Sequence, residues 1–299
     1  MLTRPCPVCA ATDAHLYWQK ADLRLVRCSR CAMVFANPVP AAYASGAYYD
    51  DSAGYYLSPA KLESDYSPVR FRRELRLFRQ HCRGGEVLDV GCSSGAFLFQ
   101  LQSQFAGAYR VLGTDVSGPP LDYAESRGVP VLRANFLEHD FKDQRFEAVT
   151  FWAVLEHLFE PGKFLEKAAS ILKPGGLCFV LVPNMGSLAV RLLKTRYRYI
   201  YPQHLNYFTT TTLCRLAATR FVAVDTRFTH FNPAVIWGDW RSHGDDVSND
   251  QRAALLAKTT RLKQNPLLLP ARAIYGLTET ALGTLGLADN IAVVFRRRA

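Results

Sequence analysis

The sequence predicts an α/β fold in which helices cover a mostly parallel sheet, with a small separate module at the N-terminus. Two observations lead to this prediction. From residue 85 to residue 182, short apolar runs alternate with segments of helical periodicity, which is the pattern of consecutive βα units. Before residue 40, four of the eight cysteines form two C-x-x-C pairs, a spacing typical of a small metal-stabilised module.

The length and composition suit such a fold. With 299 residues, of which 49% are hydrophobic and 21% charged, the chain can form one large domain and an accessory module. We find no apolar run long enough to span a bilayer and no signal-peptide core, and therefore expect a cytoplasmic protein. The net charge of +10 suits an acidic partner such as nucleic acid, a nucleotide-linked substrate or a membrane surface, although surface arginine explains it more simply.

Residues 1–40 are predicted to form a zinc ribbon. The two C-x-x-C pairs are separated by 18 residues, and the segment 17–28 is rich in strand formers, which indicates a short hairpin between them. Four thiolates fill the tetrahedral coordination of zinc, so the ion is expected to be structural. Two disulfides are the alternative, and a reducing compartment argues against them. The predicted ligands are Cys6, Cys9, Cys28 and Cys31.

Residues 41–84 are predicted to form a tyrosine-rich connector followed by a basic helix. Six of the fourteen tyrosines lie between residues 37 and 66, at positions 43, 48, 49, 55, 56 and 66. They either pack over the main domain or form an aromatic lid over a ligand. Residues 68–83 have helical periodicity, with one apolar stripe and six arginines. A solvated face is the favoured reading of these arginines, and polyanion binding is the minority one.

The segment 86–98 organises the main domain. An apolar run ends in Asp89, a loop of small residues follows with Gly91, Ser93 and Gly95, and a helical pattern then begins. This pattern is typical of a buried parallel strand that is followed by a tight turn and then by a helix. Small residues let a ligand approach the backbone, and unpaired N–H groups face it at the helix start. The acid suits the amino group of an aminoacyl ligand better than a pyrophosphate.

The segment Asp89-x-Gly91-x-Ser93-x-Gly95 resembles motif I of the class I S-adenosylmethionine (SAM)-dependent methyltransferases, with Ser93 in place of the middle glycine. Taken alone, the loop also fits a dinucleotide-binding fold or a tight turn without a ligand. Two later segments, LEHL at 155–158 and LKPGG at 172–176, resemble further marks of the family, in the expected order. The resemblance covers residues 85–230 and the last ten residues. It implies a Rossmann-like seven-stranded methyltransferase sheet.

The resemblance also implies a SAM site at the strand tips. Asp115 follows the second strand, 24 residues after Gly91, where an acid accepts hydrogen bonds from ribose hydroxyls. Asn135 and Phe136 follow the third strand, at the position that meets adenine in the family. Trp152 and Ala153 are expected to flank the methionine end. The predicted cofactor-binding residues are Asp89, Gly91, Ser93, Gly95, Asp115, Asn135, Phe136, Trp152 and Ala153.

The sequence offers one candidate general base, His204, in the segment 201–204. This segment resembles the Y-x-E-H segment of zinc-ribbon sugar C-methyltransferases, whose histidine is assigned as the base, but Gln203 replaces the glutamate. A structural role for His204 is the alternative. The candidate catalytic residues are His204, Tyr201, Glu156 and His157. Related enzymes bind a divalent ion through E-x-x-E-H and a later histidine, and here Ala153 replaces the first glutamate. Two histidines and one carboxylate could still bind a metal, but the sequence does not lead us to predict a catalytic ion.

Two further strands, at 221–228 and within 290–299, are expected to complete the sheet, the last one antiparallel at its edge. Residues 231–289 lie between them as a helical insertion that serves as a substrate cap or a homodimer contact. It carries Trp237, Trp240 and a helical stripe at 274, 277, 281 and 285. Basic residues between 191 and 198 suit a phosphate-bearing substrate such as a nucleotide sugar, or simply a solvated helix.

These observations predict SAM-dependent methyl transfer to an O or C atom of a small molecule, with a sugar or a secondary metabolite as the expected acceptor. The alternative is an RNA methyltransferase that uses the ribbon and the arginines to hold RNA. That alternative is less favoured, because the ribbon lacks interleaved aromatic and basic residues. A non-catalytic SAM-binding subunit is a third reading, against which Asp89, Asp115 and His204 count.

Overall fold

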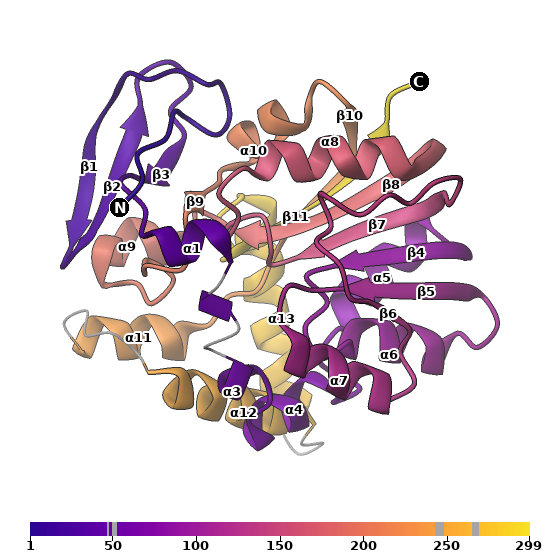
Figure 1. Cartoon of the computed structure of the whole chain (residues 1–299). Helices are drawn as coiled ribbons and strands as arrows, with labels where there is room; N and C mark the ends of the chain where they lie inside the picture. Colours follow the sequence, from indigo (N-terminus) through magenta and orange to yellow (C-terminus); the bar gives the residue numbers. More distant parts are fainter. Residues whose placement is uncertain (47, 50–52, 243–247, 265–268) are drawn as a thin grey trace.

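Two β-sheets form the framework of the protein (Figure 1). The computed structural model describes residues 1–46, 48–49, 53–242, 248–264 and 269–299. The larger sheet has seven strands, and the smaller sheet has four. Figure 1 shows the smaller sheet, the N-terminal strands β1 to β3 among its members, beside the larger one. Among the described residues, no helix is both long enough and apolar enough to cross a bilayer.

The seven-stranded sheet has the predicted methyltransferase fold. Its order is β10 (Phe221–Thr229), β11 (Asn290–Arg297), β8 (Leu172–Pro183), β7 (Phe146–Trp152), β4 (Gly85–Val90), β5 (Tyr109–Thr114) and β6 (Val131–Leu132). From β8 to β6 the strands are parallel, and Leu88 at the centre pairs with Leu112 on one side and Val149 on the other. All three belong to apolar runs, as expected for strands covered on both faces.

The position of the last strand differs from the expectation. Strand β11 is antiparallel as predicted, but it lies between β8 and β10 rather than at the edge of the sheet. The physical reason is visible in the two sequences. Residues 291–295 of β11 are all buried, whereas β10 exposes Val222 and Val224 and carries charged residues, which suits an edge strand.

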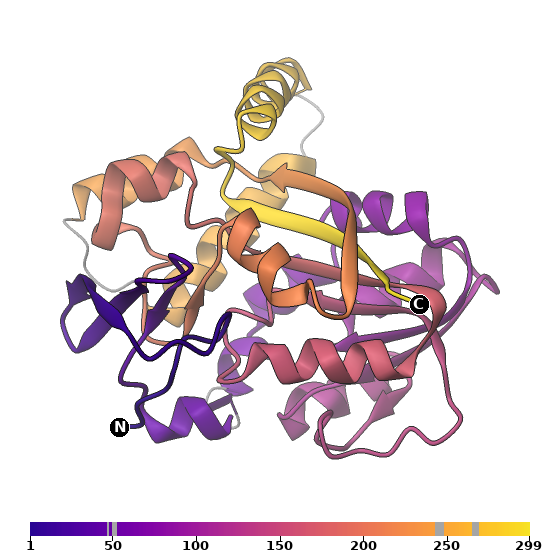
Figure 2. The same ribbon diagram turned by 90° about the horizontal axis from the view of Figure 1, so that it is seen from above.

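Helices cover both faces of this sheet. On one face, α5 (Arg72–His81), α6 (Ala96–Gln104) and α7 (Gly118–Ser126) contribute Phe78, Phe97 and Ala124 to an apolar layer that includes Phe179 of β8. On the other face lie α8 (Pro161–Ile171) and α10 (Thr210–Ala217), side by side in Figure 2, over Phe146 and Phe151. The two apolar layers hold the strands rigidly, so the loops at their carboxyl ends have a fixed base.

The N-terminal sheet includes a strand from the main domain. The expected hairpin is present as β1 (Ala14–Lys20) and β2 (Leu23–Cys28), followed by β3 (Val34–Ala36). The fourth strand is β9 (Asn206–Tyr207), which pairs antiparallel with β3 just after His204. The sequence analysis missed this pairing. It ties the cysteine-bearing module to the segment of the candidate base.

The connector and the insertion are helical and pack on each other. The connector contains α1 (Ala41–Ser45), α3 (Ala53–Tyr56) and α4 (Pro59–Asp65), and α9 (Leu188–Leu193) follows β8. The insertion contains α11 (Pro233–Arg241), α12 (Asn249–Gln264) and α13 (Leu269–Thr284). Helix α4 packs against α12, where the hydroxyls of Ser64 and Thr260 lie 2.6 Å apart. Helix α13 projects from the molecule (Figure 2), and the stripe residues Leu277 and Leu285 are exposed. The Ile274 side chain lies outside the described residues.

Candidate active site

The turn after β4 has the backbone geometry that motif I requires. Gly91 has a φ of +73°, and a Cβ atom there would lie 2.6 Å from Cγ2 of Val154, so only glycine fits. Ser93 also lies in the left-handed region, with a φ of +49°. For a residue with a Cβ this conformation costs about 1–2 kcal/mol. The strain is held in place by the hydrogen bond that the Ser93 N–H donates to Asp115, with an N···O distance of 2.8 Å.

Asp115 joins the turns after β4 and β5. One carboxylate oxygen accepts the N–H of Ser93 and the other accepts the N–H of Ser117 at 3.1 Å. Ser117 is the N-terminal cap of α7. The residues that the sequence placed on neighbouring strand tips are therefore adjacent in the structure. Their carboxylate and backbone groups form one polar edge beside the start of α6.

Asp89 is buried at the end of β4 with one hydrogen-bond donor. Its side chain accepts a hydrogen bond from the Thr150 hydroxyl of β7 at 2.6 Å, and the residue is 3% exposed. Burial raises the pKa of Asp89 to about 7, although Thr150 opposes the shift and the charge of Asp115 adds to it. A cation that binds next to this carboxyl group would favour its charged form and lower its pKa again.

The predicted adenine contacts are only partly accessible. Asn135 is exposed beyond β6, and its side-chain oxygen accepts the N–H of Leu137 at 3.0 Å, which closes a turn. Phe136 is 4% exposed and stacks on Phe164 of α8, with ring centroids 5.6 Å apart. This ring belongs to the core under α8, so the structure gives no support to the prediction that it packs on adenine. In the sequence, an apolar residue that follows a strand looks the same whether it packs on a ligand or in the core.

Trp152 and Ala153 lie at the tip of β7 but face different surroundings. The Trp152 ring packs against Phe97 of α6, with centroids 5.1 Å apart, and its Nε1 is buried without a partner among the described residues. Ala153 is exposed, with a φ of +58°, and begins the loop that leads to Glu156. Of the two, Ala153 is the one open to a ligand.

Three of the four candidate catalytic residues form a compact cluster. One ligand atom each from Glu156, His157 and His204 lies within 4.8 Å of the others. The Nδ1 atom of His157 lies 2.9 Å from the carbonyl oxygen of Gln203, and that of His204 lies 3.0 Å from the carbonyl oxygen of Tyr199. A carbonyl only accepts, so each Nδ1 carries the proton and each Nε2 presents a lone pair.

Burial determines the charge of this cluster. Glu156 is 1% exposed, and neither of its carboxylate oxygens has a hydrogen-bond partner in the described part of the chain. Burial raises the pKa of Glu156 to about 8, lowers that of His157 to about 4 and lowers that of His204 well below its usual value. Both imidazoles are therefore neutral at neutral pH.

Long-range hydrogen bonds position the cluster. The carbonyl oxygen of Glu156 accepts the N–H groups of Leu205 and Asn206, at 2.7 and 2.9 Å. The side chain of Asn206 donates to the carbonyl oxygens of Leu155 and Leu158, at 2.9 and 2.7 Å. The loop after β7 and the segment before β9 are thereby joined at their backbones, which fixes Glu156 beside His204.

Arg4, which the sequence analysis missed, completes this framework from the N-terminal module. The residue is 8% exposed, and its guanidinium donates to the carbonyl oxygens of Phe159 and Leu205, at 2.6 and 2.7 Å. It also reaches the side-chain oxygen of Asn206 at 3.0 Å. One arginine among many in a basic chain gives no sequence pattern that would single it out.

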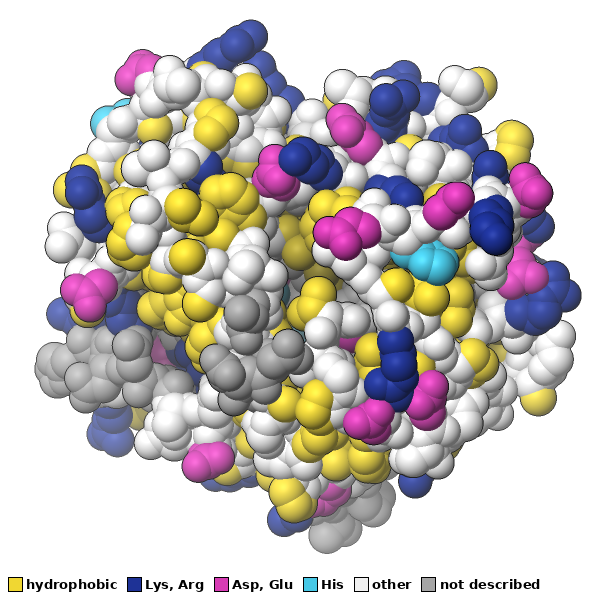
Figure 3. All heavy atoms as spheres, viewed as in Figure 1, with side chains coloured by type: hydrophobic (Ala, Val, Ile, Leu, Met, Phe, Trp, Pro, Cys, Tyr) yellow, Lys and Arg dark blue, Asp and Glu magenta, His cyan; other side chains and the backbone are white. Residues whose placement is uncertain are grey.

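Tyrosines of the connector and of the segment before β9 surround the cluster. The Tyr49 ring meets His157 edge-on at 5.8 Å, and the Tyr201 ring lies 4.4 Å from His204. Burial raises the pKa of Tyr56 well above its usual range, and the charges of Asp115 and Glu156 contribute to the shift. The described part of the connector thus extends from the turn after β5 to the histidines. Figure 3 shows hydrophobic side chains in several patches on the face that Figure 1 presents.

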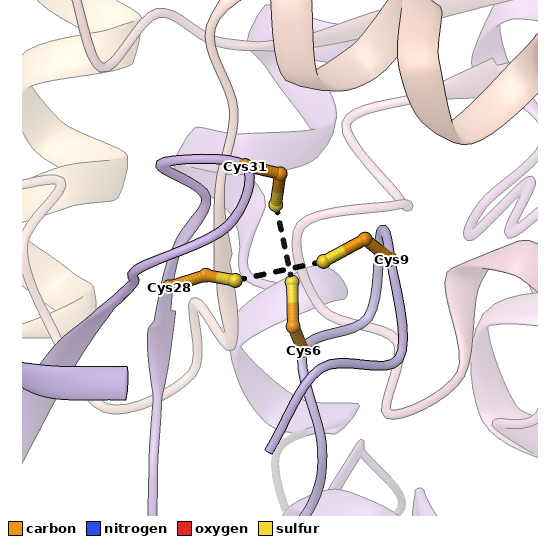
Figure 4. A group of neighbouring side chains, drawn as sticks. All are labelled: Cys6, Cys9, Cys28 and Cys31. Atoms are coloured by element: carbon orange, nitrogen blue, oxygen red, sulfur yellow. Dashed lines mark hydrogen bonds between the residues drawn. The ribbon is translucent and has the colours of Figure 1, made fainter. Parts of the chain in front are cut away.

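The four cysteines of the N-terminal module point toward a common centre (Figure 4). The Sγ atoms of Cys6 and Cys31 lie 3.4 Å apart, and those of Cys9 and Cys28 lie 3.5 Å apart. Disulfide sulfurs lie about 2.0 Å apart, so these are free thiols. Zn–S bonds of about 2.3 Å in a tetrahedron place sulfurs about 3.8 Å apart. The cluster fits a zinc ion with little adjustment.

The profile of a family described as "Methyltransferase domain" matches residues 65–220, just over half of the chain. The chain belongs to the methyltransferase domain family. This membership confirms the prediction of a class I SAM-dependent methyltransferase and, with it, of an enzyme. The match also takes in α5 and part of the connector, which the sequence analysis placed outside the conserved core.

Curated relatives of this methyltransferase-domain chain differ in their named substrates. A ubiquinone biosynthesis O-methyltransferase of Proteus mirabilis is 30% identical over 46% of this chain and 60% of its own length. A probable tRNA methyltransferase 9B of Bos taurus is 28% identical over 42% of this chain and 28% of its own length. An uncharacterized protein of Methanocaldococcus jannaschii is 29% identical over 44% of this chain. The chain matches between 28% and 61% of the lengths of these relatives.

Solved structures confirm the fold. A SAM-dependent methyltransferase of Thermotoga maritima, described as a possible histamine N-methyltransferase, covers 83% of this chain and 99% of its own, with a TM-score of 0.54 and 15% identity. A [4+2]-cyclase, SpnF, covers 87% of this chain and 97% of its own, with a TM-score of 0.54 and 17% identity. These likenesses concern the fold alone.

Proposed function

We propose that this protein transfers a methyl group from SAM to an O or C atom of a small molecule. The observation that carries the proposal is that Asp89, Ser93 and Asp115, at the carboxyl ends of β4 and β5, lie at the same end of the parallel strands as the loop after β7 that carries Glu156 of the neutral cluster. Asp89 would hold the amino group of SAM, since an ammonium ion favours its charged form. Asp115 would accept the ribose hydroxyls, as an acid at the tip of the second strand does in nucleoside-binding α/β folds.

For this reaction the protein has two tasks, to align the acceptor with the methyl group and to remove a proton from the acceptor. When bound, SAM supplies an electrophilic methyl group on a sulfonium ion. The chain's own residues have to hold the acceptor in line and take its proton. The Nε2 atom of His204 presents a lone pair at neutral pH, and the backbone contact of Nδ1 fixes the ring. The Y-x-E-H segment has a glutamate beside its histidine, and here Gln203 stands at that position. Glu156, whose carboxylate lies within 4.8 Å of the His204 ring nitrogen, would serve as the carboxylate partner instead.

The N-terminal module has a structural role in this proposal. Zn²⁺ bound by the four cysteines would order the hairpin, because small ribbons of this kind fold on their metal. The module in turn supplies β3, which pairs with β9, and Arg4, which donates to the backbone beside Glu156 and His204. The ribbon would act on the site by positioning these loops.

The enclosure of the cluster favours a small acceptor such as a sugar or a secondary metabolite. His204 and Glu156 are 3% and 1% exposed, beneath the rings of Tyr49 and Tyr201. A stem of RNA could not approach atoms buried in this way without displacing the connector. The named activity of the Proteus mirabilis relative points in the same direction.

A second candidate function is RNA methylation, and one surface feature favours it. Four arginines, at positions 72, 76, 79 and 83, line a groove of about 500 Å³ between α5 and the end of α6. This groove lies near residues 83–85 and 104–109, where the chain enters β4 and β5, at the opposite edge of the sheet from the cluster. It could hold a polyanion, as the name of the tRNA methyltransferase relative suggests, but it does not lead to His204.

A transfer assay separates these functions. Purified protein, labelled SAM and cell extract are combined, and the products are divided into small molecules and RNA. We expect label in the small-molecule fraction that survives RNase treatment. RNase-sensitive label would establish the second function instead, and label in neither fraction, with SAM bound in calorimetry, would indicate a non-catalytic SAM-binding subunit.

A further inference from the structure

The cluster of Glu156, His157 and His204 brings together two imidazole nitrogens that only accept hydrogen bonds and a buried carboxyl group that, in its charged form, also only accepts. Each histidine uses its Nδ1 proton on a backbone carbonyl, so each Nε2 offers a lone pair. The third group is a carboxylate, and the closest approach of Glu156 to Nε2 of His157 is 4.0 Å. The three ligand atoms lie within 4.8 Å of one another. Such atoms repel one another unless a positive charge lies between them.

The burial of Glu156 provides a second and independent observation. Both of its carboxylate oxygens are buried and have no hydrogen-bond partner among residues that the structure describes. A native structure rarely leaves such a group unpartnered, because a buried polar group without a partner is costly. Carboxylates in this situation are paired or bind a metal ion. The Glu156 side chain is 1% exposed, and its neighbours in the cluster are the Nε2 lone pairs of His157 and His204 rather than a basic side chain.

We propose that Glu156, His157 and His204 bind one divalent first-row transition-metal cation. Two imidazole nitrogens and one carboxylate form a donor set that these ions use with further positions left open, whereas Mg²⁺ and Ca²⁺ prefer oxygen alone. Metal bonds of about 2.1 Å place ligand atoms no more than about 4.2 Å apart. The side chains would therefore close by about 1 Å around the ion. The backbone carbonyls that hold each Nδ1–H are the outer contacts that orient ligating histidines.

The inference deepens the proposed function and rests on it for the role of the ion, although binding itself can be tested alone. With the cation in place, the lone pair of His204 is a ligand, so the cation rather than the imidazole would act on an acceptor hydroxyl. A bound cation lowers the pKa of such a hydroxyl, whose proton would pass to water as the methyl group moves from sulfur to oxygen. Ala153 stands where the E-x-x-E-H pattern has its first carboxylate, and the other three side chains supply the donor set.

Mn²⁺ is the probe that separates this site from the cysteine ribbon. Protein loaded with one Zn²⁺ per chain has its ribbon occupied and the second site open, because thiolates take the first zinc ion and do not exchange it for Mn²⁺. Titration with Mn²⁺, followed by the electron paramagnetic resonance of the free ion, is expected to show one ion bound per chain. No binding by the wild-type protein at 1 mM Mn²⁺ would overturn the proposal. A proton shared among the three side chains would then explain why they lie so close together.

Matched variants complete the test. Glu156→Gln and His204→Gln keep the size of the side chain and are expected to weaken Mn²⁺ binding at least 100-fold. His81→Gln is the control, since His81 forms another half-buried histidine–carboxylate pair, 3.0 Å from Asp225. Equal Mn²⁺ binding by Glu156→Gln and the wild type would place the ion elsewhere and overturn the assignment. Calorimetry with SAM is run in parallel: SAM binding without Mn²⁺ binding would contradict only this inference, and the reverse result would contradict only the proposed function.

Discussion

The turns after β4 and β5 and the loops that carry Glu156 and His204 lie at the same edge of the sheet, yet different parts of the chain hold them. The first region is built mainly from residues 89–117, where Asp115 accepts from the backbone of Ser93 and Ser117, and Thr150 of β7 adds a hydrogen bond to Asp89. The second is assembled from the loop after β7, the segment before β9 and the N-terminal module, which meet through Asn206 and Arg4. Cofactor binding is thus expected to depend on local contacts, and catalysis on distant ones.

The largest effect is expected from His204→Ala. Loss of a general base, or of a metal ligand, is expected to lower the rate of methyl transfer about 10²–10⁴-fold. SAM affinity should stay within twofold, because His204 belongs to the second region. Initial rates at saturating SAM and calorimetry measure the two quantities, with His81→Gln as control. Retained turnover would remove His204 from the reaction.

A smaller but selective loss is expected when the ribbon is disrupted. Cys28→Ser removes one of four sulfurs and should release the zinc, which loosens β3 and with it β9 and the Arg4 contacts. We expect transfer to fall about 100-fold while SAM affinity falls less than tenfold. Cys214→Ser, a half-buried cysteine outside the cluster, is the control. Equal losses in both quantities would show that the two regions are not separable.

The first region is tested by Asp115→Asn. Loss of a charged acceptor for the ribose is expected to weaken SAM binding about tenfold, or roughly 1.4 kcal/mol, within the range of a hydrogen bond to a charged group. The turnover rate at saturating SAM should change little. Asp122→Asn, at an exposed carboxylate of α7, serves as the matched control. Unchanged affinity in Asp115→Asn would show that the ribose assignment is wrong.

The smallest effect is a pH dependence of SAM binding. The pKa of Asp89 is raised to about 7 in the ligand-free chain, so the carboxyl group is mostly neutral at pH 6 and mostly charged above pH 7. The α-amino group that it would hold keeps its proton up to about pH 7.7–8.0. Affinity should therefore rise about fivefold from pH 6 to pH 7.4. Thr150→Val removes the hydrogen bond that favours the charged form and should move this rise to higher pH; a flat profile in the wild type would exclude Asp89 as the partner.

The comparison also explains what the sequence could and could not predict. The seven strands, their order of appearance and the residues of the first region follow from local patterns, because apolar runs and small-residue turns act within a few positions. The position of β11 inside the sheet, the pairing of β3 with β9 and the role of Arg4 depend on contacts between distant segments. Phe136 shows the limit of a motif, since an aromatic residue at that position fits a core as well as a ligand.

The pairing of β3 with β9 sets the order in which the molecule can be completed. During synthesis, the cysteine-bearing hairpin leaves the ribosome long before Asn206 and Tyr207, so its sheet keeps an open flank until most of the large domain has been made. A truncation that removes residues 1–40 would expose the opposite flank, on the strand next to the candidate catalytic histidine. The N-terminal module therefore cannot be moved to another protein or deleted without breaking the pairing of β3 with β9, although its cysteine spacing is typical of an independent domain.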